Sequence, residues 1–368
     1  MPFPPDYGGA IDVYYKIKTL HALGVKVILH AFHYGRPPAQ ELDAICEQVY
    51  YYPRRSAWES LSWKYPVMMK SRRDKQLMDN LLADNHPILF EGMHTCYYIG
   101  HAALKDRFKI IRMHNLEWDY YYALSQVERK WWKELFLRWE SAGLKSQERL
   151  LQQANAILSI SPNDHAYLSE RYAQVEMVTA FHGNAQVTST LGVGDYALYH
   201  GNLSVPENQE AVRFLLQLPL EVPLIIAGRD PDPAMVEVIE RLPHVQLEAN
   251  PSPAAMQQLL QGAQVHVMPT FQATGLKLKV LNALYQGRHV IANTPMVAQT
   301  GLETACTVAD DPGAFTQAIH QKMQQPFTEA HRAEREKLLQ PFGDEEKGRR
   351  IVAFLKGKSN GESAEKIS

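Results

Sequence analysis

The densest group of residues suited to ligand chemistry is PTFQATGLKLKVLNALYQGRHVIAN, residues 269–293. A short apolar run and a polar loop lead to a predicted helix that begins near Thr274 and Gly275. A glycine at a helix start lets a phosphate approach the free backbone N–H groups. Lys277 and Lys279 follow at the positive end of the helix dipole, where a cation is unfavourable unless an anion compensates it. An anionic ligand would account for both lysines, and so would two solvated surface groups.

Two further segments place similar groups at predicted helix starts. In LIIAGRDPDP, residues 224–233, Arg229 follows an apolar run and could make a charge-assisted contact with a phosphate, or a salt bridge with a neighbouring aspartate. In PPDYGGAIDVYYKIKTL, residues 4–20, Gly8 and Gly9 precede a helix. They either admit a phosphate or a sugar, or they form a simple turn.

A histidine follows another predicted strand. In IIRMHNLEWDYYYAL, residues 110–124, the strand delivers His114 to its carboxyl end. Its imidazole is there a hydrogen-bond donor or base, or a buried structural group. Glu117 could orient it or cap the following helix. His30 and His33 could suggest a metal pair, but the sequence shows no third ligand, so we predict that no metal is bound.

Short apolar runs alternate with amphipathic stretches along the whole chain, and these elements must position the candidate side chains. Strands are predicted at residues 25–32, 88–91, 109–114, 156–161, 176–181, 196–201, 222–228, 245–248, 265–268, 290–293 and 306–309. Helices are predicted at residues 10–23, 162–172, 206–218, 231–242 and 275–286. This alternation predicts an α/β fold with parallel sheets covered on both faces. Such sheets bind ligands at the carboxyl ends of their strands.

The 368 residues are enough for two α/β domains of about 180 residues each. The small polar segment GNAQVTSTLGVGD interrupts the pattern. We therefore predict an N-terminal domain at residues 1–183, a C-terminal domain at 184–342, and a helix with a polar tail at 343–368.

Composition narrows the functional class. A formal net charge of -2 argues against a general nucleic-acid-binding protein, which usually carries a basic excess. Three widely spaced cysteines fit a reducing cytoplasm and define no disulfide framework. The sequence contains no apolar run of about 18 residues, and its first residues lack the features of a signal peptide. A cytoplasmic location is predicted.

The order and spacing of these motifs resemble the retaining GT-B glycosyltransferases of group 1 (family 4), which include bacterial exopolysaccharide and mannosyl transferases. The similarity covers nearly the whole chain. Its segments are PFPPDYGGAIDVYYKIKTLHALGVKVILH, RMHNLEWDYYYAL, YHGNLSVPENQEAVRFLL, PLIIAGRDP and ATGLKLKVLNALYQGRHVIAN. The resemblance implies two Rossmann-like domains whose parallel sheets face each other across a cleft.

The resemblance also implies a function. A UDP- or GDP-linked sugar would bind mainly to the C-terminal domain, and a carbohydrate or lipid-linked acceptor mainly to the N-terminal domain. The reaction would need no metal or further cofactor. His114 and Lys277 are the implied catalytic residues, with Lys277 stabilising the leaving diphosphate. The implied nucleotide-sugar-binding residues are Gly8, Gly9, Arg229, Thr274, Gly275, Lys279 and Asn282.

The chain departs from the family pattern in ways that bear on activity. Thr274 and Asn282 occupy positions where the family often carries two glutamates, and Asn282 is a shorter, neutral group. The family also has a strand ahead of PFPP, in the centre of the N-terminal sheet, that this sequence does not show. A catalytically impaired sugar-nucleotide-binding or scaffold protein is therefore the alternative function. A sugar-nucleotide epimerase is a further rival, but no convincing pair of acid/base carboxylates is evident.

A basic and aromatic surface is predicted within residues 53–75, PRRSAWESLSWKYPVMMKSRRDK. Its arginines, lysines and tryptophans could contact an anionic membrane that presents a lipid-linked acceptor. An ordinary solvated helix would show the same composition. Contact with the inner face of the membrane would then be peripheral.

Overall fold

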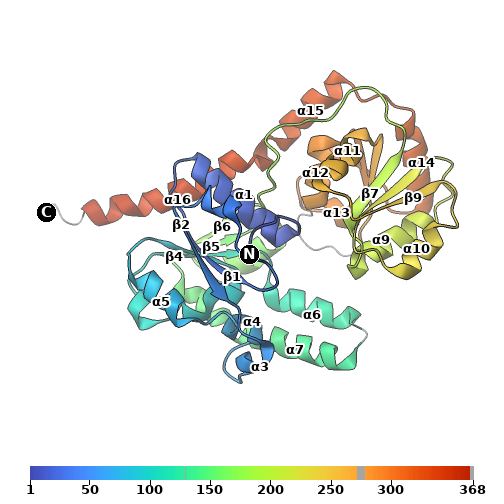
Figure 1. Cartoon of the computed structure of the whole chain (residues 1–368). Coiled ribbons are helices and arrows are strands. Elements are labelled where there is room, and N and C mark those ends of the chain that lie inside the picture. The colour runs from blue at the N-terminus through green and yellow to red at the C-terminus, as the bar shows by residue number, and fades with distance from the viewer. Residues whose placement is uncertain (129, 272–277, 365–368) are drawn as a thin grey trace. The chain divides into compact units, whose positions relative to one another are not determined.

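The computed structural model describes residues 1–128, 130–271 and 278–364 (Figure 1). The chain divides into two compact units, one formed by residues 1–183 with 344–368 and the other by residues 184–343. Each unit contains parallel strands joined through helices. The predicted α/β class with parallel sheets is confirmed.

The first unit holds two separate parallel sheets, a two-stranded sheet β1-β2 and a four-stranded sheet β3-β4-β5-β6. Its strands are β1 (Ile28–His33), β2 (Gln48–Pro53), β3 (Ile88–Glu91), β4 (Lys109–Met113), β5 (Ala156–Ser159) and β6 (Val175–Met177). Its α-helices are α1 (Gly8–Ala22), α2 (Gln40–Asp43), α3 (Ala57–Ser60), α4 (Val67–Lys70), α5 (Lys75–Leu82), α6 (Glu117–Val127), α7 (Trp131–Ser146), α8 (Pro162–Ser169) and α16 (Asp344–Ala364). Short 3₁₀ helices are η1 (Met93–Tyr98), η2 (Ala102–Leu104) and η3 (Glu148–Gln153).

The second unit is built on one six-stranded parallel sheet in the order β12-β11-β10-β7-β8-β9. Its strands are β7 (Ala197–Asn202), β8 (Leu224–Arg229), β9 (Val245–Ala249), β10 (Val265–Met268), β11 (His289–Ala292) and β12 (Thr307–Val308). Its helices are α9 (Pro206–Leu216), α10 (Pro233–Ile239), α11 (Pro253–Gly262), α12 (Leu278–Gln286), α13 (Thr294–Val297), α14 (Pro312–Met323), α15 (Glu329–Leu339), η4 (Glu303–Ala305) and η5 (Gln340–Phe342). The strand order reverses between β7 and β10, so the carboxyl ends of these two strands are the expected ligand position.

Local sequence explains why these elements form. Strands β4, β5, β10 and β11 are buried at every residue and are mainly apolar, as strands of a parallel sheet between covering helices should be. Helices α8, α10, α11 and α14 each begin with a proline, directly after a serine or aspartate whose side chain accepts a backbone N–H. A capped start with proline at the first position is a preferred helix signal.

Strand β2 was not predicted, because its sequence QVYYYP shows neither a continuous aliphatic run nor a polar alternation. It pairs in parallel with β1 along all six residues. The ring of His30 in β1 stacks on those of Tyr50 and Tyr52, and its Nδ1 lies 2.9 Å from the hydroxyl of Tyr52. Cross-strand ring packing therefore stabilises a strand that the hydrophobic pattern does not reveal.

Helix α16 belongs to the first unit although it follows the second in the chain. It lies along α1 (Figure 1), and a Cβ added to Gly348 would lie 2.6 Å from Thr19 Cγ2 and 2.8 Å from Leu23 Cδ1. The buried ammonium of Lys347 donates to the carbonyl oxygen of Ala180 at 2.6 Å. The C-terminal helix is thus part of the packing of the first unit.

Candidate functional site

Five charged or titratable side chains gather where β3 and β4 end beside α1. Asp12 and Lys16 lie one turn apart on α1, and both are buried. Glu91 is the last residue of β3. Arg112 lies in β4 and is fully buried, and His114 follows that strand. Because parallel strands end at one edge of a sheet, the group occupies the edge where such sheets bind ligands.

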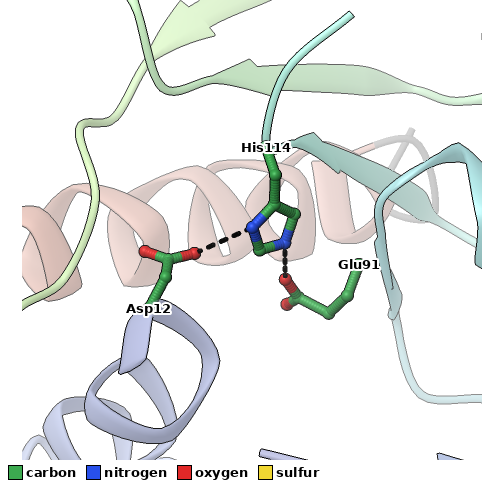
Figure 2. A group of neighbouring side chains, drawn as sticks. All are labelled: Asp12, Glu91 and His114. Carbon is green, nitrogen blue, oxygen red and sulfur yellow. Dashed lines mark hydrogen bonds and ion pairs between the residues drawn. The ribbon is translucent and has the colours of Figure 1, made fainter. Parts of the chain in front are cut away.

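His114 lies between two carboxylates (Figure 2). Its Nε2 is 3.0 Å from Oε2 of Glu91, and its Nδ1 is 3.6 Å from Oδ2 of Asp12. The imidazole side chain is 19% exposed, so part of the ring remains accessible from solvent. The two carboxylates together hold the ring in one orientation.

Each carboxylate also has a cationic partner. Arg112 donates from Nε and Nη2 to the two oxygens of Asp12, at 2.9 and 2.8 Å. The backbone N–H of Phe181 donates to the same carboxylate at 2.7 Å. Lys16 donates to Glu91. Two anions are therefore balanced by two cations, and the bidentate pair adds directional rigidity to the network.

The ion pairs outweigh the effect of burial on both carboxylates. Burial alone would raise the pKa of Asp12, but the Arg112 guanidinium and the Lys16 ammonium hold it well below its usual range. Burial also opposes ionisation of Glu91, yet Lys16 and the hydrogen bond with His114 lower the pKa of Glu91 to about 2. Both groups are consequently ionised at neutral pH.

Asp12, Glu91 and His114 are groups of the kind that hold metal ions, and one ligand atom from each lies within 4.8 Å of the others. A divalent cation there would lie beside the charges of Arg112 and Lys16, which already neutralise the two carboxylates. Repulsion between these fixed charges and the ion makes the cluster a poor metal site. That the protein binds no metal stays a prediction.

Glu117 contacts His94 and not His114, the histidine that it was expected to orient. Its carboxylate accepts the backbone N–H of His94 at 3.1 Å and lies 2.9 Å from Nδ1 of the same residue. Gly92, which precedes this contact, has φ 82°. A Cβ there would overlap the Glu117 carboxylate and the His94 ring. The turn after β3 therefore requires glycine.

Gly8 and Gly9 are the first two residues of α1. Tyr7 precedes them without a side-chain hydrogen bond to the helix, and the first turn contains no acidic residue. A Cβ added to Gly8 would have no atom within 4 Å, whereas one added to Gly9 would lie 3.3 Å from the Tyr7 ring. The helix start thus leaves open space beside the backbone of Gly8, and ligand binding there stays a prediction.

In the second unit, Lys279 extends from the first turn of the described part of α12. Its ammonium donates to Oδ1 of Asn208 at 3.0 Å and to the hydroxyl of Tyr199 at 3.2 Å, and it lies 4.9 Å from the centre of the Tyr199 ring. Lys279 is therefore not a solvated surface group, because its ammonium has partners within the second unit. The same partners show that a ligand is not needed to account for its position. Lys279 ties α12 to α9 and β7.

A second polar group lies at the same edge of this sheet. The backbone N–H of Thr270, just after β10, donates to Oδ1 of Asn293 at 3.0 Å, and the amide of Asn293 donates back to the carbonyl of Thr270 at 2.6 Å. The Thr270 hydroxyl donates to Glu207 of α9. These contacts fix the loop that leads into residues 272–277.

The remaining predicted residues of the second unit are only partly brought together. Arg229 ends β8, and its carbonyl accepts the N–H of Leu203 at 2.8 Å. Asn282 lies on α12, where its Oδ1 accepts from the amide of Asn184 at 2.9 Å. Thr274, Gly275 and Lys277 lie outside the described residues.

Asp12, Lys16, Glu91 and Arg112 were not singled out from the sequence. One signal was present, because Arg112 interrupts the apolar residues Ile110, Ile111 and Met113 of a strand that is predicted to be buried on both faces. A buried arginine requires anionic or carbonyl partners. The identity of those partners, about 100 residues away in the case of Asp12, depends on the fold.

Across residues 1–128, 130–271 and 278–364, the structure contains no helix with the length and apolar composition of a membrane span.

Comparison with known proteins bears on both units. Residues 194–325 match the family described as Glycosyl transferases group 1. A Klebsiella pneumoniae protein, described as an uncharacterized 44.6 kDa protein in the cps region, is 23% identical over 342 residues, covering 86% of this chain and 87% of that protein.

Solved structures share the fold over nearly the full length. The Anabaena protein HepE, in complex with UDP and glucose, has a TM-score of 0.65 at 14% identity, covering 96% of this chain and 98% of that chain. Sucrose-phosphate synthase from Thermosynechococcus elongatus has a TM-score of 0.62 at 16% identity, covering 97% and 93%. Residues 194–325 of the second unit are therefore similar to group 1 glycosyl transferases, and the chain has the GT-B fold of two Rossmann-like domains with parallel sheets.

Proposed function

We propose that the protein transfers a hexosyl group from a nucleotide diphosphate sugar to a carbohydrate or lipid-linked acceptor, with retention of anomeric configuration. The group 1 match over residues 194–325 carries this proposal, since it contains the elements that bear Arg229, Lys279 and Asn282. The Anabaena structure with UDP and glucose supports a UDP-linked donor, and a GDP-linked donor is the other option. The cps-region relative supports a role in surface polysaccharide or glycoconjugate synthesis.

In this proposal the second unit binds the donor. Arg229 at the end of β8 and Lys277 neutralise the diphosphate, and the backbone amides near Gly275 donate to it. Lys277 acts as the catalytic cation, because it counters the negative charge that develops on the leaving diphosphate. Thr274 and Asn282 offer neutral hydrogen-bonding groups to the sugar and the ribose.

The first unit contributes His114 to the same reaction. Its ring is held between Asp12 and Glu91 and is partly accessible, so it can contact the transferred sugar without reorientation. Gly8 and Gly9 at the start of α1 allow a sugar or phosphate to approach the backbone. No metal or further cofactor takes part.

A catalytically impaired donor-binding or scaffold protein is the second candidate. It is favoured by the contact of Asn282 with Asn184, because the carbonyl oxygen that would reach a ribose hydroxyl already accepts a hydrogen bond within the unit. The absence of a carboxylate at positions 274 and 282 points the same way.

A nucleotide screen followed by a turnover assay separates these functions. UDP, GDP and their sugar conjugates are tested by thermal shift, where a ligand at 100 times its dissociation constant adds about 2.7 kcal/mol of stability. Lys277→Ala should abolish the shift, while Lys337→Ala on the exposed side of α15 should keep it. Release of nucleotide with transfer of sugar then supports the enzyme, and binding without turnover supports the scaffold. Epimerised donor formed without acceptor would contradict both.

We further propose that residues 53–75 contact an anionic membrane surface at the inner face of the cytoplasmic membrane. Trp58 and Trp63 are 85% and 100% exposed, and Arg55 and Lys64 beside them are also exposed. Tryptophan and basic side chains together favour the interface of anionic bilayers.

Vesicle pelleting tests this contact. The protein should sediment with vesicles containing anionic phosphatidylglycerol more than with neutral phosphatidylcholine vesicles, and the paired change Trp58→Ser with Trp63→Ser should remove the difference. Equal recovery with both vesicle types would reject membrane contact through this surface.

A further inference from the structure

The segment by which the chain leaves the first unit, residues 178–183, is held by charged side chains along its whole length. This exit segment follows β6 and ends at Gly183, after which the chain passes into the second unit. It forms neither helix nor strand. Its sequence, VTAFHG, contains no lysine, arginine, aspartate or glutamate, so the charges that hold it come from other elements of the first unit.

The first three residues of the exit segment present carbonyl oxygens to cations. Arg112 of β4 donates from Nη1 to the carbonyl oxygen of Val178 at 2.9 Å and from Nη2 to that of Thr179 at 3.1 Å. Lys347 of α16 donates to the carbonyl oxygen of Ala180 at 2.6 Å. A carbonyl oxygen is the negative end of the peptide dipole, so each of these charge-assisted contacts is favourable.

The last three residues present N–H groups to anions instead. The N–H of Phe181 donates to the carboxylate of Asp12 at 2.7 Å. The N–H groups of His182 and Gly183 both donate to Asp344, the first residue of α16, at 3.1 and 2.7 Å. Two cations and two anions therefore hold six consecutive residues, and the backbone groups that they contact are sorted by charge.

Asp344 joins the two places where the chain crosses between the units. The chain leaves the first unit after Gly183 and returns to it at Asp344. The carboxylate of the returning residue holds the last two residues of the exit segment. Lys347, one turn further along α16, lies 2.7 Å from the same carboxylate. The leaving and returning parts of the chain thus meet in one charged junction of the first unit.

This junction and the candidate catalytic histidine share one carboxylate. Asp12 accepts the N–H of Phe181 through Oδ1, and its Oδ2 lies 3.6 Å from Nδ1 of His114. Arg112 contacts both Asp12 and the exit segment. Because protein interiors are closely packed, a displacement of the exit segment must also displace the Asp12 carboxylate, and with it one of the two partners of His114.

A second connection between the junction and Asp12 is electrostatic. The side chain of Lys347 is only 2% exposed. Burial lowers the pKa of its ammonium, and the charges of Asp344 and Asp12 oppose this effect. If Asp344 lost its charge, the buried ammonium would be drawn toward Asp12, where it would compete with His114 and Arg112.

We infer that Asp344 and Lys347 are positioning residues for His114, which act through the exit segment and Asp12. The inference rests on the proposed function, in which His114 contacts the transferred sugar, whereas the coupling itself is a property of the first unit. It gives a role in the reaction to the start of α16, a helix that follows the whole second unit in the chain. The proposed donor contacts in the second unit do not involve either residue.

Nuclear magnetic resonance of the histidine rings tests the coupling without a substrate. The ring nitrogen signals of His114, identified by their loss in His114→Gln, should shift in Asp344→Asn, which removes the charge but keeps an oxygen for the backbone N–H groups. Asp311→Asn is the control, because Asp311 also lies at a helix start, where it accepts the N–H of Ala314 in the second unit. It should leave these signals unchanged. Unmoved His114 signals in folded Asp344→Asn would overturn the inference.

Steady-state kinetics tests the consequence for sugar transfer. Asp344→Asn should lower kcat by about tenfold or more and change the donor KM by less than about twofold, because the histidine is displaced while the donor contacts remain. Asp311→Asn should change neither constant. A raised donor KM with unchanged kcat would contradict the positioning role. If no donor is turned over at all, the proposed function fails, and the ring signals still decide the coupling.

Lys347→Met covers the case in which Asp344→Asn does not fold, as judged by circular dichroism. Methionine keeps most of the apolar stem of the lysine, and Asp344 keeps its contacts with the exit segment. The substitution removes a positive charge near Asp12, so the His114 ring signals should shift in this variant as well. If only Lys347→Met folds and its His114 signals are unchanged, the inference is wrong.

Discussion

Buried charged residues need specific partners within the protein, because water does not reach them. Arg112 has no exposed side-chain surface, and Asp12 has almost none, so neither charge is solvated by water. Each is instead satisfied by the other and by backbone groups, including the carbonyls of Val178 and Thr179 and the N–H of Phe181. Such a pair fixes the positions of the two side chains more than it adds net stability, because the cost of desolvation offsets the attraction between the charges.

Arg112→Met should therefore destabilise the first unit strongly. It leaves the Asp12 carboxylate buried without its cation, which costs about 3–5 kcal/mol. The double variant Asp12→Asn with Arg112→Met should lose less, because no unpaired charge remains. Urea unfolding of the three proteins measures this, and a double variant at least as unstable as Arg112→Met would contradict it.

The acid dependence of stability should follow Glu91. Its pKa is about 2 in the folded protein, against 4.5 for the ordinary group. A carboxylate with a lowered pKa stabilises the fold above its unfolded pKa and loses this contribution as pH falls through the folded value. The contribution, up to about 3 kcal/mol, should thus disappear between about pH 4.5 and 2.

Glu91→Gln should flatten the dependence of unfolding free energy on pH in that window. The readout is the slope rather than the absolute stability, since the substitution also leaves Lys16 without its partner. Chemical denaturation at several pH values provides the slope, and a slope identical to that of the unsubstituted protein would show that Glu91 is not the group responsible.

At the scale of elements, the strands and helices that carry the charged residues follow from local sequence, whereas the turn after β3 does not. Predicted strands at residues 88–91 and 109–114 are confirmed by β3 and β4, and the helix predicted at residues 10–23 by α1. Local sequence determines these elements because continuous apolar runs and helix-start residues act over a few positions. The turn after β3 depends on distant residues as well, since Gly92 is required by the contact between Glu117 and His94.

Gly92→Ala should consequently cost more stability than Gly24→Ala. Both glycines have a positive φ, 82° and 79°, so both substitutions carry a similar backbone cost of about 1 kcal/mol. At Gly24 the added Cβ has no atom within 4 Å, whereas at Gly92 it overlaps the Glu117 carboxylate. Thermal melts of the two variants should differ by several degrees, and equal melting points would show that the Glu117–His94 contact gives way without cost.

At the scale of the whole molecule, the chain order and the packing order differ. The first unit is completed by α16, which lies after the second unit in the sequence. Ile351 on this helix packs with Leu20 of α1 in the same apolar cluster. Folding of the first unit therefore depends on residues at both ends of the chain.

Gly348→Leu should loosen the first unit selectively. The larger side chain would collide with Thr19 and Leu23 of α1, so α16 must shift away. Amide exchange should accelerate in peptides from α1 and α16 and stay unchanged in β7 and β8 of the second unit. Ser169→Leu at the end of α8 is a control in the same unit, and faster exchange throughout both units would contradict this local effect.

The alternating elements, the α/β class and the family resemblance could be predicted from the amino-acid sequence alone, because these features depend on short-range periodicity and on motif order. The sequence also indicated His114 as a candidate, because the end of a strand can be predicted from the neighbouring residues. The position of His114 between Asp12 and Glu91 could not be predicted in this way. Nor could the contacts of Lys279 with Tyr199 and Asn208, or the cavity that β1 and β3 both line. Those contacts join residues far apart in the chain, and the sheet register and helix packing that bring them together are properties of the whole fold.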